Sequence, residues 1–316
     1  MKHLVILSTK NRETYVLKFL DSLFLNQAEF EVLIVDSTEP KVRFESFDLE
    51  LKTLYRDKKF THIFHKGRLP SARNRGLEYI SNHEYIHFFD DDVILPNDYF
   101  EKVEDFLMIN KEVSGGGPLI SGYTPLLKFK LSKNLFHSLF IPFYNLIIKS
   151  YSGKVTKSCR NYWVPEDFNG NSLYVDWIPG CSMFFKSHIF NNFTFNQNLE
   201  SLFLGYSLGE DLEFTYRVSR EFKLAVVKNL KVVHDHAPSP RADLVFINGC
   251  FGALTAHMHT MFPNDFKKRN IFVSRIFFLL KIYYAKKEVT LKEIFILFRN
   301  FKFQFDRELL NQNFKQ

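Results

Sequence analysis

The amino-terminal part of the sequence predicts an α/β protein built on a mostly parallel sheet. A short apolar run at 3–7 is followed by an amphipathic stretch at 14–26 and by a second apolar run at 31–35. This order of strand, helix and strand implies parallel pairing through a right-handed crossover. The alternation continues with elements expected at 61–65, 70–81 and 85–89. Repeated alternation of this kind is typical of a parallel sheet covered by helices.

After the strand expected at 85–89, the regular alternation of strands and helices ends. A glycine-rich stretch at 115–122 predicts a loop, and Phe, Leu, Ile and Lys recur with helical spacing at 124–151. The remaining elements are a strand interrupted by a Pro-Gly turn, a helix and two short strands, expected at 176–185, 209–221, 224–227 and 232–234. A chain of this length favours one large core with additions.

The composition indicates an anionic partner and a reducing compartment. The formal net charge is +7, which suits a nucleotide diphosphate, a membrane lipid or a nucleic acid. Cys159, Cys181 and Cys250 are widely spaced and odd in number, so neither a disulfide framework nor a zinc cluster is expected. The first residues do not resemble a secretion signal, and no apolar run is long enough to span a membrane. We therefore expect a cytoplasmic protein whose membrane contact, if any, is peripheral.

Three adjacent carboxylates, Asp90, Asp91 and Asp92, follow the apolar strand expected at 85–89. Like charges this close repel one another unless a cation or bound hydroxyls compensate them. Mg²⁺ and Mn²⁺ prefer oxygen ligands and often bind carboxylates together with substrate phosphates. Asp36 ends the second strand at the same edge of the sheet, where open parallel sheets bind ligands. The alternative is a solvated acidic turn at a strand end.

Two later segments add further polar side chains. Glu210 and Asp211 begin an expected helix, where acidic residues also serve as ordinary caps. His234 and His236 alternate at a strand end, so both face the same side and either can ligate a metal. Arg241, on the loop that follows, can neutralise a phosphate.

The segment GRLPSARNRGL places Arg73 near the start of an expected helix. Backbone N–H groups and side-chain donors can engage an anion together at such a position. A charged, solvated helix face is the alternative interpretation.

The order of these motifs closely resembles glycosyltransferase family 2. The succession over 1–245 is STKNR, VDSTEP, ARNRG, FFDDDV, GCSMFF, GEDLEF and HDHAPSPR. The resemblance implies the GT-A fold, a Rossmann-like mixed, mostly parallel sheet flanked by helices, here with a C-terminal helical extension. It also implies a catalytic domain over 1–245, with a nucleotide-sugar-binding half at 1–120 and an acceptor-binding half at 121–245. A basic aromatic extension at 246–316 follows.

The resemblance implies donor and metal roles for individual residues. Thr9 and Asp36 resemble residues that hold the base of the donor nucleotide, and Arg73 resembles one that supports base or phosphate. Asp90 and Asp91 resemble the carboxylates near the ribose. Asp92 matches the metal ligand of the DxD motif, His234 resembles a late metal ligand, and His236 is the competing choice.

The chemistry implied is inverting transfer of a sugar from a nucleotide-sugar donor. Asp211, beside Glu210, matches the general base toward the acceptor hydroxyl, and Arg241 can support the leaving phosphate. Mn²⁺ or Mg²⁺ is the implied cofactor. Two departures, one carboxylate in VDSTEP and STKNR in place of the commoner PTYNR, bear on which base is preferred.

A glycan or polyprenyl-linked glycan is the expected acceptor, in bacterial surface polysaccharide synthesis such as capsule or O-antigen. Basic amphipathic stretches at 126–151 and 266–305 either lie in the inner membrane interface or pack on the core. Rival interpretations are a non-catalytic carbohydrate-binding protein and a nucleic-acid-binding protein, and the latter leaves the acidic cluster unexplained. A haloacid-dehalogenase-like phosphatase is disfavoured because FFDDDV follows a later strand than that family requires. Nucleic acid is therefore not an expected partner.

Overall fold

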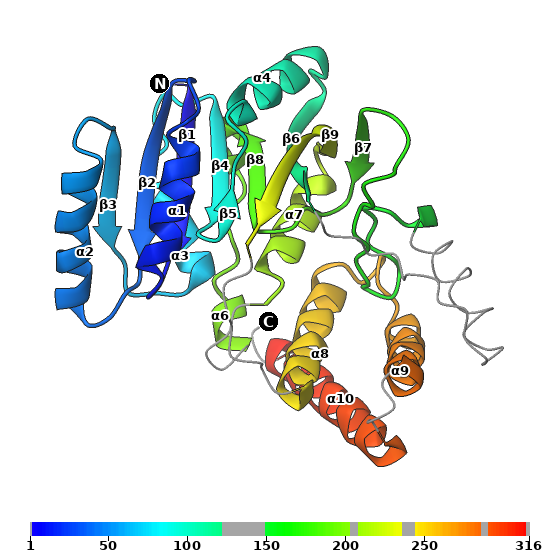
Figure 1. Ribbon diagram of the computed structural model, residues 1–316. Helices are drawn as coiled ribbons and strands as arrows, with labels where there is room; N and C mark the ends of the chain where they lie inside the picture. The colour runs from blue at the N-terminus through cyan, green and yellow to red at the C-terminus, as the bar shows by residue number, and fades with distance from the viewer. Residues whose placement is uncertain (1, 122–148, 203–207, 236–243, 286–289, 314–316) are drawn as a thin grey trace. The chain divides into compact units, whose positions relative to one another are not determined.

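The computed structural model describes residues 2–121, 149–202, 208–235, 244–285 and 290–313, which form two compact units (Figure 1). The first unit comprises Met1–Lys154, Tyr162–Phe195 and Phe214–Ala237. The second unit comprises Val155–Asn161, Asn196–Glu213 and Pro238–Gln316. The functional division expected at residues 120 and 245 stays a prediction.

The first unit contains a mixed sheet whose amino-terminal half is parallel (Figure 1). Its strand order begins β3-β2-β1-β4, and each neighbouring pair in this half is parallel. These strands are β1 (His3–Thr9), β2 (Phe30–Asp36), β3 (Phe60–Phe64) and β4 (Tyr85–Asp90). The strand, helix, strand alternation predicted from the sequence is therefore confirmed.

The second half of the sheet mixes parallel and antiparallel pairs. Its order is β8-β6-β9-β5, and β7 pairs with β9 off this path. These strands are β5 (Val93–Ile94), β6 (Val113–Ile120), β7 (Ser172–Val175), β8 (Ser182–Lys186) and β9 (Lys223–His234). The antiparallel pairing of β4 with β8 joins the two halves, so that the sheet is mixed but carries its parallel block at one end.

Helices cover both faces of this sheet because successive strand residues alternate between two apolar cores. Val5 and Leu7 of β1 belong to one core, and Leu4 and Ile6 belong to the other. The first core is covered by α1 (Glu13–Leu23), α2 (Lys41–Leu54) and α4 (Tyr99–Ile109). The second core is covered by α3 (Leu69–Leu77), η1 (Ser187–Asn191) and the later part of α7 (Glu210–Ser219).

The glycine-rich stretch at 115–122 was expected to be a loop, and this expectation is wrong because the stretch forms most of β6. Gly115 and Gly116 lie in the middle of the sheet, where a Cβ would collide with the Phe185 ring and with the carbonyl oxygen of Ala225. The glycines are therefore needed for close packing, and they leave no apolar pattern that marks a strand.

Two other expectations for the carboxyl-terminal half of the sheet are corrected. Only the end of the strand expected at 176–185 is a strand, since β8 begins at Ser182. The two short strands expected at 224–227 and 232–234 are one continuous strand, β9. Its pairing with β6 shifts register between Pro118 and Leu119, whose partners in β9 are Val227 and Lys231.

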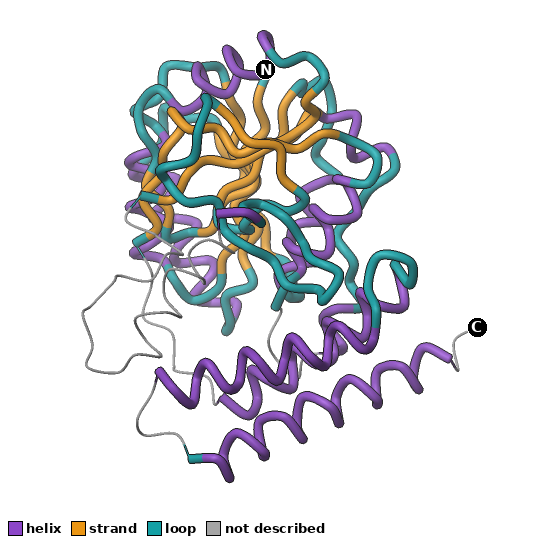
Figure 2. Tube along the Cα trace, turned by 90° about the vertical axis from the view of Figure 1, so that its right-hand side faces the viewer, coloured by secondary structure: helices purple, strands orange, loops and turns teal. Residues whose placement is uncertain are grey.

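The described part of the second unit is mostly helical. It contains α6 (Leu199–Leu202), the first residues of α7, α8 (Leu244–Met261), α9 (Lys268–Ala285) and α10 (Leu291–Asn313), and the three long helices appear as long coils in Figure 2. Gly252 of α8 lies so close to the backbone of Phe301 in α10 that a Cβ would collide with it. Small residues thus permit the close approach of these two helices.

The helical extension expected at the carboxyl end is confirmed. Within the described residues, no helix combines the length and apolar character needed to cross a bilayer. The helical pattern expected at 124–151 falls mostly outside the described residues.

Candidate nucleotide-sugar and metal site

The parallel strands place their terminal polar residues at one edge of the sheet. β1 ends at Thr9, which pairs in register with Asp36 at the end of β2. Ser8 of β1 pairs with Asp90 at the end of β4. The carboxyl ends of these three strands therefore bring together the residues that the sequence assigned to donor binding, at the edge where open α/β sheets bind ligands.

Asp91 ties the loop after β1 to the end of β4. Thr9 Oγ1 donates a hydrogen bond to Asp91 Oδ2 at 2.6 Å, and Arg12 donates to Asp91 Oδ1 at 2.9 Å. Burial raises the pKa of Asp91, against these two hydrogen bonds, which lower it. Asp91 therefore fixes the position of Thr9 and Arg12 beside the other two carboxylates.

Asp90 is held by a buried arginine. Arg73 donates to the carbonyl oxygen of Gly180 at 2.9 Å and to Asp90 Oδ1 at 3.3 Å, and it is only 1% exposed. Its guanidinium also lies over the Phe195 ring, 5.2 Å from the centroid. Burial raises the pKa of Asp90 to about 6, Arg73 opposes this rise, and the neighbouring carboxylates add to it.

Asp92 contacts His234 across a short antiparallel pairing. β5 pairs with β9 so that Val93 lies opposite His234, and the backbone N–H of Asp235 donates to the carbonyl of Asp92 at 2.8 Å. This brings His234 Nε2 to 2.9 Å from Asp92 Oδ1. Burial lowers the pKa of His234, but the hydrogen bond and charge of Asp92 outweigh it, so the pKa is raised.

Asp90, Asp92 and His234 together fit a divalent cation. Each offers one ligand atom, and these atoms all lie within 4.8 Å of one another. Two carboxylate oxygens and one imidazole nitrogen are ligands that transition-metal ions such as Mn²⁺ accept. Asp91 and Asp92 add to the rise in the pKa of Asp90 that burial causes, and a bound cation would oppose that rise. The sequence had assigned Asp90 to the ribose, and the geometry adds it to the candidate metal ligands.

Asp36 is buried at the end of β2 and shapes the turn after it. Its Oδ1 accepts a hydrogen bond from the backbone N–H of Thr38 at 2.7 Å, and its Oδ2 lies 3.3 Å from His62 Nε2. The carboxylate is therefore oriented from two sides, with His62 of β3 behind it. The assignment of Asp36 to the nucleotide base stays a prediction.

The sequence did not predict the contact of Arg12 with Asp91 or the contact of His62 with Asp36. Arg12 was quoted within STKNR without a role, although a cation on the loop after β1 faces the acidic ends of neighbouring strands. No local signal marked His62, because its contact with Asp36 depends on the parallel register of β2 and β3.

The remaining predicted residues lie in other parts of the chain. Glu210 and Asp211 belong to the second unit, at the start of α7, directly after Gly209 with its positive φ of 82°. Asp211 Oδ1 accepts a hydrogen bond from the backbone N–H of Leu212 at 2.7 Å. His236 and Arg241 fall outside the described residues.

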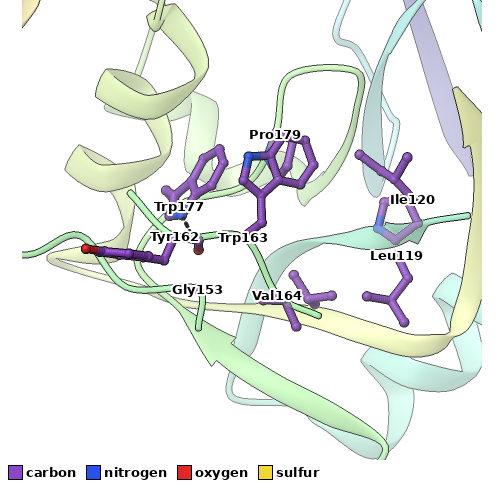
Figure 3. Close-up of a pocket in the computed structure, with 10 residues that line it drawn as sticks. Leu119, Ile120, Gly153, Tyr162, Trp163, Val164, Trp177 and Pro179 are labelled. Atoms are coloured by element: carbon purple, nitrogen blue, oxygen red, sulfur yellow. Dashed lines mark hydrogen bonds between the residues drawn. The ribbon is translucent and has the colours of Figure 1, made fainter. Parts of the chain in front are cut away.

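The first unit also contains a small aromatic pocket of about 20 Å³ (Figure 3). Trp177 Nε1 donates a hydrogen bond to the carbonyl oxygen of Tyr162 at 3.0 Å. The Trp163 and Trp177 rings pack edge to face, with 5.4 Å between their centroids. Pro179 lines the same pocket and precedes Gly180, the carbonyl partner of Arg73. A residue that lines the aromatic pocket is therefore adjacent in sequence to a residue that Arg73 contacts.

The chain belongs to glycosyl transferase family 2, whose model matches residues 4–174, more than half of the sequence. It is therefore a glycosyltransferase, and the resemblance predicted from its motifs is confirmed. No curated protein matches the sequence.

Solved structures share the fold at low sequence identity. S. aureus TarS 1-349 is 17% identical with a TM-score of 0.52, and the match covers 98% of this chain and 83% of that one. The mannosyltransferase PcManGT from Pyrobaculum calidifontis, in complex with GDP-Man and Mn²⁺, is 15% identical with a TM-score of 0.52, covering 84% and 65%. GalNAc-T7 with UDP, GalNAc and Mn²⁺ is 10% identical with a TM-score of 0.56, covering 81% and 51%. The predicted GT-A fold is confirmed.

Proposed function

We propose that this glycosyltransferase binds a nucleotide-diphosphate-sugar together with Mn²⁺ or Mg²⁺ at the carboxylate cluster of the first unit. The observation that carries the proposal is the convergence of Asp90, Asp92 and His234 within 4.8 Å at the carboxyl edge of the parallel strands. Support comes from TarS, crystallised with UDP-GlcNAc, and from PcManGT and GalNAc-T7, crystallised with Mn²⁺.

The residues around the cluster would position the donor. Asp36, oriented by Thr38 and His62, can accept hydrogen bonds from the N–H groups of a base. Arg73 donates hydrogen bonds to Asp90 and to the carbonyl of Gly180, so it acts as a positioning residue. Asp92 and His234 would hold the cation, with His236 as the alternative ligand. When bound, the cation would offset the negative charge that develops on the departing diphosphate.

The acceptor hydroxyl must lose its proton as it attacks, and a positioned carboxylate can take that proton. We assign this role to Asp211, with Glu210 as its neighbour at the start of α7. A single displacement then inverts the anomeric centre. Arg241 would support the leaving phosphate, as the family motif implies.

The acceptor is proposed to be a glycan or a lipid-linked glycan in bacterial surface polysaccharide synthesis. Transfer of a hexose or a related sugar fits this setting.

The surfaces of α9 and α10 support peripheral contact with the inner face of the cell membrane. Large apolar side chains are exposed there, with Phe277 and Phe295 each 66% exposed and Phe303 60% exposed. Exposed cations accompany them, among them Lys292, Arg299 and Lys302. Aromatic residues beside cations suit an anionic membrane interface.

The donor is identified by a thermal-shift screen against UDP-, GDP-, CMP- and dTDP-sugars, each with and without Mn²⁺, on the wild type and on Asp92→Asn. A ligand that binds only the folded state raises the melting temperature. We expect one nucleotide class to stabilise the wild type only with Mn²⁺ and to lose this effect in the variant. A folded wild type that responds to none of the four classes would contradict the proposal.

A further inference from the structure

The second unit contains a cavity of about 190 Å³ that none of the proposed catalytic residues lines. Its walls come from α8, α9, α10 and the segment Val155–Asn161, all within that unit. The volume of this cavity is several times the volume that one buried water requires. A cavity of this size has room for a small polar group.

The side chain of Arg275, a residue of α9, lies in this wall. The Arg275 guanidinium carbon lies 4.9 Å from the Phe278 ring centroid and 5.0 Å from that of Phe301. Arg275 Nε is enclosed, and it makes no hydrogen bond within the described part of the chain. Aromatic faces favour the flat sides of a guanidinium, but they do not replace the hydrogen bonds that its N–H groups donate.

A second arginine lies beside the first. The Arg160 guanidinium carbon is 5.3 Å from the centroid of the same Phe278 ring. Burial, and then the like charge of Arg160, lowers the pKa of Arg275 to about 10. Burying the Arg275 cation beside a second cation costs free energy that a bound anion would recover.

The other lining residues are chemically suited to an anion. None of the described residues that line the cavity is Asp or Glu. The polar groups besides the two arginines are neutral and include Ser158, Asn161, Thr255 and Ser274. Ser158 Oγ already lies 2.9 Å from Thr156 Oγ1, which orients one of these hydroxyls. Guanidinium groups surrounded by hydroxyls and an amide are a donor set for a multiply charged oxyanion.

We infer that this cavity binds a phosphate or diphosphate group through Arg275 and Arg160. A phosphate offers enough oxygen atoms and charge to engage two guanidinium groups, whereas a single carboxylate is satisfied by one. The group has two possible sources, a soluble phosphorylated molecule or the headgroup of an anionic lipid. The inference is independent of the donor site, because it uses none of the residues assigned there.

The test is a titration with inorganic pyrophosphate in buffer free of divalent metal, followed by the melting temperature. The variants are Arg275→Met, which fills a similar volume without charge, Arg275→Lys, which keeps the charge, and Arg160→Gln. Asp92→Asn is the matched control for binding at the carboxylate cluster. We expect pyrophosphate to stabilise the wild type and Asp92→Asn alike.

The apparent affinity should fall by about tenfold or more in Arg275→Met, because a charge-assisted hydrogen bond is lost. The apparent affinity for pyrophosphate should fall less in Arg160→Gln than in Arg275→Met. The affinity of Arg275→Lys should lie between those of Arg275→Met and the wild type. An unchanged pyrophosphate response in a folded Arg275→Met would overturn the inference and leave Arg275 as a packing residue. So would a response that disappears in Asp92→Asn or is absent from the wild type.

Vesicle flotation distinguishes the two sources. Phosphatidylglycerol vesicles are compared with phosphatidylcholine vesicles for the wild type and Arg275→Met. Binding to phosphatidylglycerol that weakens in the variant assigns the cavity to a lipid headgroup. Equal binding of the two proteins, with the pyrophosphate response lost in the variant, assigns it to a soluble phosphate.

Discussion

Two charged clusters of opposite sign occur in this chain, one in each unit. In the first unit, three carboxylates are partly balanced by Arg12, by buried Arg73 and by His234. In the second unit, Arg160 and Arg275 are held on phenylalanine rings, and no described lining residue is acidic.

The comparison shows how each cluster specifies a ligand of opposite charge. Burial raises the pKa of Asp90 to about 6, and the neighbouring carboxylates add to that rise. Burial, and then the like charge of Arg160, lowers the pKa of Arg275 to about 10. A cation and a phosphate, respectively, would complete these two clusters.

The largest expected effect is that of Asp92→Asn on transferase activity. The substitution removes a proposed cation ligand and the hydrogen-bond partner of His234. We expect kcat/KM to fall by about a thousandfold, the scale seen when a charge-stabilising group is removed. Asp57→Asn, at an exposed position, is the control and should keep wild-type activity. Activity within tenfold of the wild type would contradict the metal assignment.

Arg73→Met should give the largest loss of stability. It leaves Asp90 and the Gly180 carbonyl without their buried donor. Breaking a buried ion pair from one side typically costs about 3 kcal/mol in unfolding free energy. Urea denaturation measures this loss, and Arg73→Lys, which keeps the charge, should lose less. Equal stability of Arg73→Met and the wild type would mean that Asp90 does not depend on Arg73.

The core of the first unit contains a pair of buried histidines, His3 and His87. His3 Nδ1 lies 2.9 Å from His87 Nε2, and burial lowers the pKa of both histidines, with His87 well below its ordinary value. The folded state therefore binds fewer protons than the unfolded state at mildly acidic pH. Stability is full above the unfolded pKa of about 6.5 and decreases as the pH falls below it.

Each histidine that must stay neutral contributes a slope of up to about 1.4 kcal/mol per pH unit below that pKa. His87→Phe keeps an aromatic ring among Phe89, Phe100 and Phe184, so it should flatten the dependence of unfolding free energy on pH between 5 and 7. Urea titrations across this range measure the slope. An unchanged slope in the variant would show that His87 is protonated without cost in the folded protein.

The smallest expected effect concerns Arg12, which is 37% exposed and competes with a cation for the carboxylates. Arg12→Met should tighten Mn²⁺ binding in the absence of nucleotide by about threefold, a modest gain because solvent screens the charge. Isothermal titration with Mn²⁺ measures the change. Weaker Mn²⁺ binding in this variant would mean that Arg12 organises the cluster rather than opposing the cation.

The parallel half of the sheet was predictable because its strands are short, apolar and separated by amphipathic helices. β6 was not predictable in the same way, since its glycines leave no apolar pattern. The need for them arises from Phe185 and Ala225, which are distant in the sequence. Local patterns thus identified the elements whose own side chains form the core. They missed β6, because its glycines are required by residues of other strands that pack against it.

The candidate site was predictable where chemistry is concentrated in a short motif. Asp90 and Asp92 stood out as adjacent charges at a strand end, and His234 stood out within a family motif. Arg12 and His62 were missed because their roles follow from contacts with Asp91 and Asp36 across the fold. The cavity around Arg275 had no sequence signal, because its wall is assembled from separate helices.

Electron paramagnetic resonance of Mn²⁺ shows whether Asp90, Asp92 and His234 hold a divalent cation. Free Mn²⁺ is titrated against the wild type, Asp92→Asn, His234→Gln and Arg275→Met, with and without UDP. We expect the wild type and Arg275→Met to bind one Mn²⁺, and to bind it more tightly with a suitable nucleotide. In the other two variants the Mn²⁺ affinity should fall by at least about tenfold. Equal Mn²⁺ affinity in all four proteins would contradict the metal assignment.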